Sequence, residues 1–174
     1  MPVWPFTPSR AEADAARLLR AVEAASRRPA FYGAGRVADT LEGRFELLAL
    51  NAALALLRLR AEAEAAPLAQ AFTDRFFRSI DAGLRESGVG DLSVPKKMRG
   101  LAGAFYGRLN AYAEALAASD QARLAEAIQR NIVDADAASF APALAAYAAE
   151  AWRLQAGAPL DALFSGENWP ALGG

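Results

Sequence analysis

The sequence predicts an all-α protein, a single compact bundle of about six or seven helices. Alanine, the strongest helix former, makes up about a quarter of the 174 residues, and β-branched residues are few. Apolar side chains recur at steps of three and four along most of the chain, which is the spacing of one helix face. Hydrophobic residues amount to 54% of the chain, enough for a buried core, so we expect one folded domain over 9–165 with short tails, 1–8 and 166–174.

The first two helices are predicted from a cap and from apolar spacing. Ser9 is a suitable N-cap for a helix that runs to about Arg28, and a short aromatic connection over 29–35 follows it. The second helix is expected over 37–66, and it should be central because apolar side chains cover two neighbouring faces. These side chains are Val37, Leu41, Phe45, Leu48, Ala52, Ala55 and Leu59 on one face and Leu47, Leu50, Leu54 and Leu57 on the other.

The third and fourth helices are predicted on either side of a glycine-containing loop. The third ends at Ser87 and Gly88, where Gly88 suits a left-handed C-terminal cap. Ser93 is the expected cap of the fourth, which has Pro95 in its first turn. Their inward stripes are Phe72, Phe76, Ile80 and Leu84 in the third, and Met98, Leu101, Phe105, Leu109, Tyr112 and Leu116 in the fourth.

Two further helices complete the predicted core. One is capped near Ser119, and the other begins near Asp136 and ends at Gly157. A short amphipathic turn over 160–164 precedes the C-terminal tail. The inward residues are Leu124, Ile128 and Ile132 in the first helix, and Phe140, Leu144, Tyr147, Ala151 and Leu154 in the second.

The composition excludes several classes of catalytic chemistry and of partner. Without histidine or cysteine, the chain can form no Ser-His-Asp triad, no disulfide, and no imidazole or thiolate metal site. Nineteen basic and twenty acidic residues argue against a chain-wide nucleic-acid surface, so we expect no DNA partner. The longest uncharged run, 137–149, is shorter than the ~20 residues that span a bilayer. We therefore expect a cytoplasmic protein with none of these catalytic or metal sites.

A basic turn opens the fourth helix. Lys96 and Lys97 are the only lysines of the chain, and Arg99 follows them. Positive charge in a first turn opposes the helix dipole and costs roughly 0.3–1 kcal/mol per exposed residue. The turn is either solvated surface or a contact for an anionic partner, whether acidic side chains, lipid headgroups or RNA phosphates.

The loop before that turn places Val89 and Leu92 among flexible glycines. These side chains either staple the loop to the core or provide a small apolar anchor for another chain. The adjacent basic turn supports the second interpretation, because binding surfaces combine an apolar centre with a charged rim.

Two other stretches carry charged or aromatic candidates. Gly43 inside a strong helix indicates close packing, and Glu42 and Glu46 flank it one turn apart, where Arg44 or another cation could neutralise them. An acid–base pair or a divalent ion there lacks further acidic residues and is disfavoured. Tyr106 is expected about 100° away from the core-facing Phe105, which leaves it either between helices or in an interface.

These stretches, in this order, resemble the ubiquinol–cytochrome c chaperone family over roughly residues 31–131. Two positions depart from the family pattern: Asn51 stands where a histidine is expected, and Pro95 where glycine is common. The residues that carry the resemblance are Phe31-Tyr32, Asp39-Thr40, Gly43-Arg44-Phe45-Glu46-Leu47, Asp81, Leu84-Arg85-Glu86, Gly88-Val89-Gly90-Asp91-Leu92, Val94, Lys96-Lys97-Met98-Arg99, Ala104-Phe105-Tyr106-Gly107-Arg108 and Arg130-Asn131.

The resemblance implies a helical, cofactor-free chaperone that binds newly made cytochrome b and supports assembly of the cytochrome bc1 complex. It also implies work near the ribosomal tunnel exit and peripheral contact with the inner face of the membrane. We expect one client-binding face. Its residues are Arg44, Glu46, Asp81, Arg85, Val89, Asp91, Leu92, Lys96, Lys97, Met98, Tyr106 and Arg108.

The alternative function is a binding module for a small apolar ligand, such as a quinone or an acyl chain. Such a ligand would lie between the helices that carry Phe72, Phe76 and Phe105.

Overall fold

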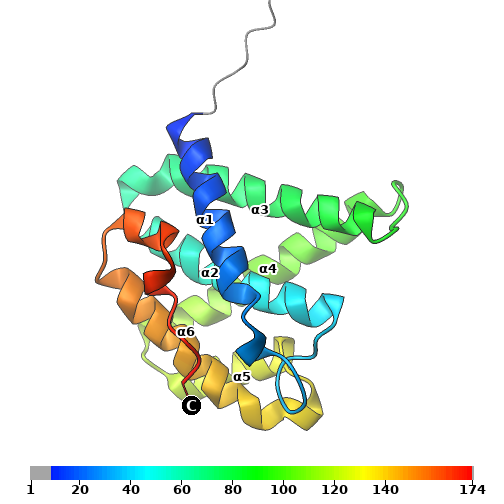
Figure 1. The fold of residues 1–174 in the computed structure, drawn as a ribbon, viewed down its shortest axis with the longest axis vertical. Helices are drawn as coiled ribbons and strands as arrows, with labels where there is room; N and C mark the ends of the chain where they lie inside the picture. Colours follow the sequence, from blue (N-terminus) through cyan, green and yellow to red (C-terminus); the bar gives the residue numbers. More distant parts are fainter. Residues whose placement is uncertain (1–8, 174) are drawn as a thin grey trace, which may run out of the picture.

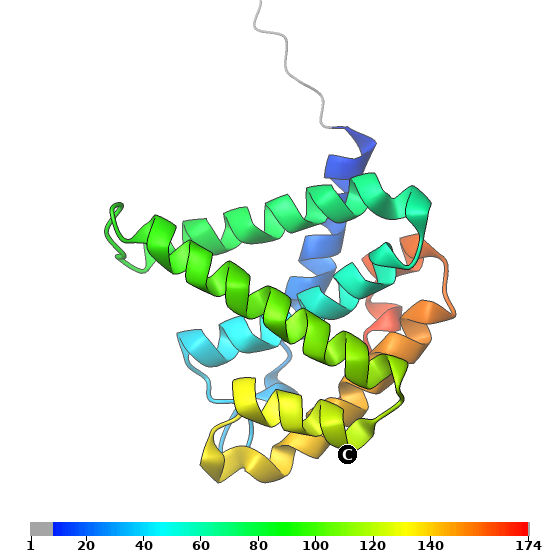
Figure 2. The same cartoon turned by 180° about the vertical axis from the view of Figure 1, so that it is seen from behind.

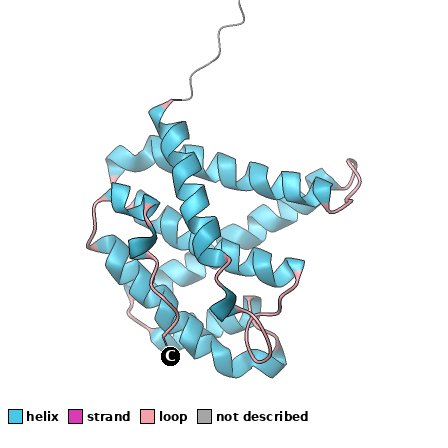
Figure 3. Cartoon of the chain, in the orientation of Figure 1, coloured by secondary structure: helices cyan, strands magenta, loops and turns pink. Residues whose placement is uncertain are grey.

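The computed structural model describes residues 9–173, and these residues form six α-helices linked by 3-10 helices, with no strand among them (Figure 3). The predicted all-α fold is confirmed. The α-helices are α1 (Arg10–Ser26), α2 (Leu41–Arg60), α3 (Ala66–Glu86), α4 (Val94–Ala117), α5 (Gln121–Asn131) and α6 (Ala141–Ala156). The 3-10 helices are η1 (Pro29–Phe31), η2 (Ala63–Ala65), η3 (Ala135–Phe140), η4 (Leu160–Phe164) and η5 (Gly166–Asn168).

Helix α2 lies at the centre of the bundle. It packs against α1, α3, α4 and α6, and Leu47, Leu50 and Leu54 are completely buried along it (Figures 1 and 2). Its two apolar faces explain this position, because each is covered by a different neighbour. The prediction of a central second helix is therefore confirmed.

The predicted bounds of that helix, 37–66, were wrong at both ends. The helix begins at Leu41, because the side chain of Thr40 accepts a hydrogen bond from the Gly43 amide (3.1 Å) and caps it. Val37 instead lies in a short bridge with Tyr32, and Leu41 is 62% exposed rather than part of the core stripe. The helix ends at Arg60, and Pro67 stands in the first turn of α3.

Helix caps account for most of the other bounds. Ser9 forms a full capping box with Glu12 at the start of α1, as its sequence position indicates. The cap of α5 is Asp120 and not Ser119, which takes a left-handed conformation (φ 52°) just before it. Ser93 stands at the N-cap of α4, but its side chain accepts no capping hydrogen bond. Asp136 lies in η3, so α6 begins later than predicted.

Helices α3 and α4 form a long hairpin whose closed end projects from the bundle (Figures 1 and 2). The predicted left-handed Gly88 is confirmed (φ +87°). The amide of Val89 donates to the carbonyl of Leu84 and that of Gly88 to Arg85, both at 3.1 Å, which is a Schellman motif. These bonds satisfy the carbonyls at the end of α3 and fix the direction in which the loop leaves it.

The C-terminal segment returns along α1 and packs onto the bundle (Figure 1). Trp169 is only 2% exposed, and its indole N–H donates to the carbonyl of Leu163 (3.3 Å). Over the described residues, no helix combines the length and the apolar character that a membrane crossing requires.

Candidate functional site

Eight of the predicted site residues lie together at the closed end of the α3–α4 hairpin. We call residues 81–98, which include the end of α3, the loop and the first turn of α4, the hairpin tip. The residues are Asp81, Arg85, Val89, Asp91, Leu92, Lys96, Lys97 and Met98.

Arg85 holds the loop of the hairpin tip against α3. Its Nε donates to the carboxylate of Asp81 (2.8 Å), and its Nη1 donates to that of Asp91 (2.5 Å). The hydrogen bond to Asp81 raises the pKa of Arg85 above its ordinary value, with a smaller effect of Asp91. One guanidinium therefore links the helix to the loop, and both carboxylates have a partner within the tip.

The apolar residues of the loop divide into buried and exposed ones. Val94 is 1% exposed although it lies outside the main core cluster, and Val89 is partly buried. Leu92 is 98% exposed. The staple interpretation therefore does not apply to Leu92, which presents its whole side chain to solvent on a loop fixed by the Schellman motif and by Arg85.

The basic turn is also free of internal partners. Lys96, Lys97 and Arg99 are exposed, and no acidic residue stands in the first turn of α4. None of the three forms an ion pair within the described part of the chain. The hairpin tip thus combines an exposed leucine with two available lysines, and Arg99 stands next to it. Asp81 and Asp91 are already paired with Arg85, whereas Glu86 is exposed and forms no ion pair among the described residues.

Tyr106 and Arg108 do not belong to this surface. Tyr106 lies about 15 Å further along α4 than Lys96. Its ring is 37% exposed and lies below the Arg60 guanidinium, at 5.9 Å. Arg108, two residues on, points about 160° away around the helix axis. The structure therefore does not place Lys96, Tyr106 and Arg108 on one face.

Arg108 instead forms a largely buried ion pair with Glu46 of α2. Its Nη2 lies 2.9 Å from Glu46 Oε1, and the two side chains are 16% and 15% exposed. The other carboxylate oxygen of Glu46, the Nε and Nη1 of Arg108 and the hydroxyl of Tyr112 are buried without a hydrogen-bond partner. Burial raises the pKa of Glu46 to about 7, although Arg108 acts in the opposite direction. The pair links α2 to α4 rather than offering charge to a partner.

Arg44 takes a separate position near the start of α2. Its Nε donates to the carboxylate of Asp39 (2.7 Å), so Arg44 does not neutralise Glu42 or Glu46. The hydrogen bond from Arg44 lowers the pKa of Asp39. Gly43 shows the close packing that the sequence indicates, since a Cβ there would clash with the carbonyl oxygen of Ala38.

Asn51, which departs from the family pattern, forms a buried polar contact between three helices. Its amide donates to Ser26 Oγ (2.9 Å), and its carbonyl oxygen accepts from the Tyr147 hydroxyl (2.8 Å). Asn51 is completely buried. The amide therefore has a structural role that needs no titratable group.

The phenylalanines of the alternative ligand site pack against one another. Phe72, Phe76 and Phe105 are each 1% exposed, and the ring centroids of Phe76 and Phe105 are 5.0 Å apart. The rings occupy the space between α3 and α4. Among residues 9–173, no group of three or more acidic side chains could hold a metal ion.

Sequence reasoning missed a second basic surface, formed by Arg17 and Arg20 of α1 and by Arg28, which lies just beyond the helix. Along the chain these arginines alternate with acidic residues such as Asp14 and Glu23. The spacing at 17, 21 and 24, which places one arginine and two alanines in one line, was the available signal.

Comparisons with known proteins agree with this architecture. The chain matches the family model described as ubiquinol-cytochrome C chaperone over residues 34–169. A similar solved structure is the crystal structure of the Cbp3 homolog from Brucella abortus. It is 41% identical with a TM-score of 0.80, and the match covers 91% of this chain and 90% of that one. Among curated proteins, none matches. The family model covers most of the chain, which therefore belongs to the ubiquinol–cytochrome c chaperone family.

Proposed function

We propose that this chaperone supports assembly of the cytochrome bc1 complex by binding newly synthesised cytochrome b at the hairpin tip. Membership of the family supports a role in assembly without enzymatic chemistry. The observation that carries the choice of surface is Leu92, which is 98% exposed on a fixed loop. In this proposal Leu92 is the apolar centre and the charged residues of the tip are its rim, which is the arrangement of a binding surface.

The chemistry of the tip fits a membrane-protein client before its assembly. Leu92 provides an apolar contact worth roughly 1.5–3 kcal/mol when fully buried. Lys96 and Lys97 attract acidic side chains on the client, and their charges are not used within the chaperone. Val89 and Met98, both partly buried, extend the apolar centre beside Leu92.

The remaining predicted residues serve this surface indirectly. In this proposal, the ion pair of Glu46 and Arg108 sets the angle at which α4 leaves α2, and so the position of the tip. Tyr106 and Arg44 lie on the flanks of the same two helices and would contact the client only where it extends beyond the tip.

The client also suggests the place of action. We infer that a chaperone for newly made cytochrome b, a membrane protein, works at the inner face of the membrane, close to the ribosomal tunnel exit. The basic turn of Lys96, Lys97 and Arg99, at the edge of the tip, is suited to anionic lipid or ribosomal phosphate at that place.

Site-specific photo-crosslinking tests the proposal. A crosslinker replacing Leu92 or Lys96 should label newly made cytochrome b. Leu41, which is 62% exposed on a different helix, is the matched apolar control, and Glu150 on α6 is the polar one. Crosslinks that form only from positions 41 or 150 would contradict the proposal that the hairpin tip binds the client.

A second measurement tests the consequence for the complex. Leu92→Glu should lower the amount of assembled bc1 complex toward that of a deletion strain, while the chaperone itself remains folded. Leu41→Glu should leave assembly unchanged. Normal bc1 levels in the deletion strain would refute the assembly role itself.

A further inference from the structure

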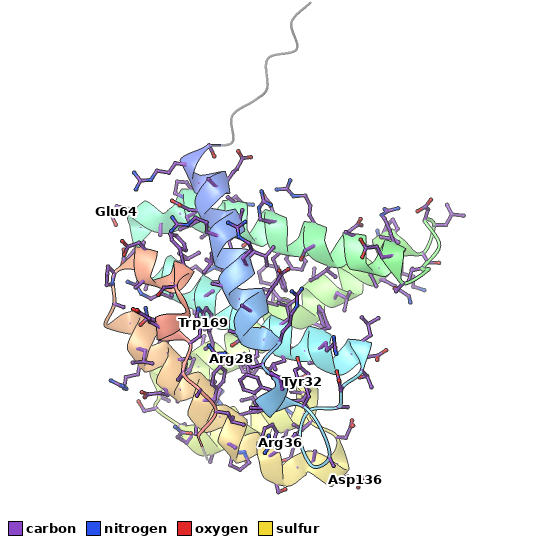
Figure 4. All side chains as sticks on the ribbon, viewed as in Figure 1. Arg28, Tyr32, Arg36, Glu64, Asp136 and Trp169 are labelled. Atoms are coloured by element: carbon purple, nitrogen blue, oxygen red, sulfur yellow. The ribbon has the colours of Figure 1, made fainter. Side chains whose placement is uncertain are left out.

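A basic groove lies between α1 and the C-terminal segment. Its volume is about 380 Å³, and Phe164 and Trp169 form the wall opposite α1. Figure 4 labels Arg28 and Trp169, which lie close together where the C-terminal segment passes α1. The C-terminal segment that forms this wall lies on the side of α1 away from the hairpin tip (Figure 1).

The face of α1 that lines this groove has a regular pattern. Arg17, Ala21 and Ala24 follow one another at helical spacing and so form a single line along α1. Arg28 also lines the groove, but it lies just beyond the C-cap of the helix with extended backbone (φ −61°, ψ 127°). Because the alanines between the two arginines are small, a ligand can approach the helix closely along the middle of the groove.

The charged residues that line the groove are all arginines: Arg17, Arg20 and Arg28. The Arg17 guanidinium stacks on the ring of Phe164, 4.8 Å from its centre, and its Nη1 donates to the carboxylate of Asp14 (3.4 Å), which is not part of the lining. Arg28 Nη1 donates to the carbonyl of Pro170 (2.6 Å). Arg20 is exposed and forms no ion pair with any described residue. Two guanidinium groups are thus positioned by the protein and a third remains free on the rim.

We propose that this groove binds an acidic peptide segment of a partner protein. Planar guanidinium groups bind carboxylates through paired hydrogen bonds, so a segment with acidic side chains spread along it can engage more than one arginine of the groove. A concave, elongated groove with a floor of alanines accepts a peptide, whereas a bilayer surface is flat and would not enter it. The partner is distinct from the client of the hairpin tip, and both can be bound at once because the two surfaces are separate.

Fluorescence anisotropy with the full chain tests this inference. The probe is a labelled peptide with glutamates spread along it, and the control peptide carries glutamines in their place. The acidic peptide should bind and the glutamine peptide should not. Arg20→Gln should weaken binding about two- to fivefold, and Arg17→Gln combined with Arg20→Gln about tenfold.

Two further variants separate a built groove from general charge attraction. Arg27→Gln removes the same charge from the same helix outside the groove, and it should leave affinity within about twofold of the wild type. Ala24→Phe fills the floor without changing charge and should abolish binding. Equal losses in Arg20→Gln and Arg27→Gln, or full binding by Ala24→Phe, would overturn the proposal.

A second binding assay, with lipid vesicles, distinguishes a site for carboxylates from a site for phosphates. Vesicles with phosphatidylglycerol should bind the wild type and Arg20→Gln equally. If instead the vesicles lose affinity in Arg20→Gln while the acidic peptide fails to bind the wild type, the groove takes a phosphate headgroup and the peptide proposal is wrong.

Discussion

Two arginines of the α3–α4 hairpin make ion pairs in opposite surroundings. Arg85, at the tip, is 46% exposed and pairs with two carboxylates that solvent also reaches. Arg108, at the base, is 16% exposed and pairs with one carboxylate, and two of its nitrogens are left without partners. Exposed pairs contribute about 0–1 kcal/mol, whereas removal of one partner from a buried pair costs several. Changes at the tip should therefore alter binding, and changes at the base should alter folding.

The largest effect is expected for Arg108→Ala. Loss of the guanidinium leaves Glu46 largely buried without its partner, which should lower the free energy of unfolding by about 3 kcal/mol. Urea denaturation measures this loss of unfolding free energy. The double variant Glu46→Gln/Arg108→Met should regain most of the loss, because no unpaired charge remains. If Arg108→Ala were as stable as the wild type, the buried ion pair at the base would contribute no more to stability than the exposed pairs at the tip.

Gly43→Ala should have the next largest effect on the free energy of unfolding. A Cβ at Gly43 meets the Ala38 carbonyl, so the start of α2 must shift, and we expect a loss of roughly 1–3 kcal/mol. The matched control is Gly100→Ala in α4, where a Cβ meets nothing within 4 Å and stability should rise by about 0.5–1 kcal/mol. Thermal unfolding of both variants tests the pair. Equal shifts in the two would contradict the close packing at α2.

The pH dependence of stability should distinguish the buried pair of Glu46 and Arg108 from the exposed pairs of Arg85. The pKa of Glu46 is about 7 in the folded chain against 4.5 for a free side chain, so between these values the folded state binds more protons than the unfolded one. Its contribution to stability therefore falls as pH rises from about 4.5 to about 7. Denaturation at several pH values should show this decline in the wild type relative to Glu46→Gln. Parallel pH profiles for the two proteins would argue against a raised pKa.

The smallest effect on stability is expected for Arg85→Gln. Both of its ion pairs are exposed, so the free energy of unfolding should change by less than about 1 kcal/mol. The loop should nevertheless become more mobile, because Asp91 loses its link to α3. Faster hydrogen exchange over 88–92 with unchanged exchange in α2 is the expected result. A large loss of global stability would mean that the tip is part of the folding core.

The fold could be predicted from the sequence because it depends on local patterns. Apolar spacing predicted the central α2. Ser9 marked the start of α1 because its side chain caps the helix, and Gly88 marked the end of α3 because it takes a left-handed conformation. The start of α2 was misplaced because Leu41 has the right spacing but no neighbour covers it. The choice between Ser119 and Asp120 as a cap depended on a left-handed residue that composition does not indicate.

The candidate site could be predicted only where it is continuous in sequence. The hairpin tip, 81–98, is one stretch of chain, so its residues had to be neighbours. Tyr106 and Arg108 were grouped with it although a two-residue step turns about 200° around a helix. The pairing of Arg108 with Glu46 and the groove of Arg17, Arg20 and Arg28 are formed by segments far apart in sequence, and spacing along one helix does not show which distant segment packs against it.

The Schellman motif at the end of α3 has a kinetic consequence. Since Gly88 and Arg85 already fix the loop, little conformational entropy is lost when a client covers Leu92. A single leucine nevertheless offers a small contact area, so the complex should form readily and dissociate within a short residence time. Under the proposed function, a chaperone with those rates would release its client without any input of chemical energy.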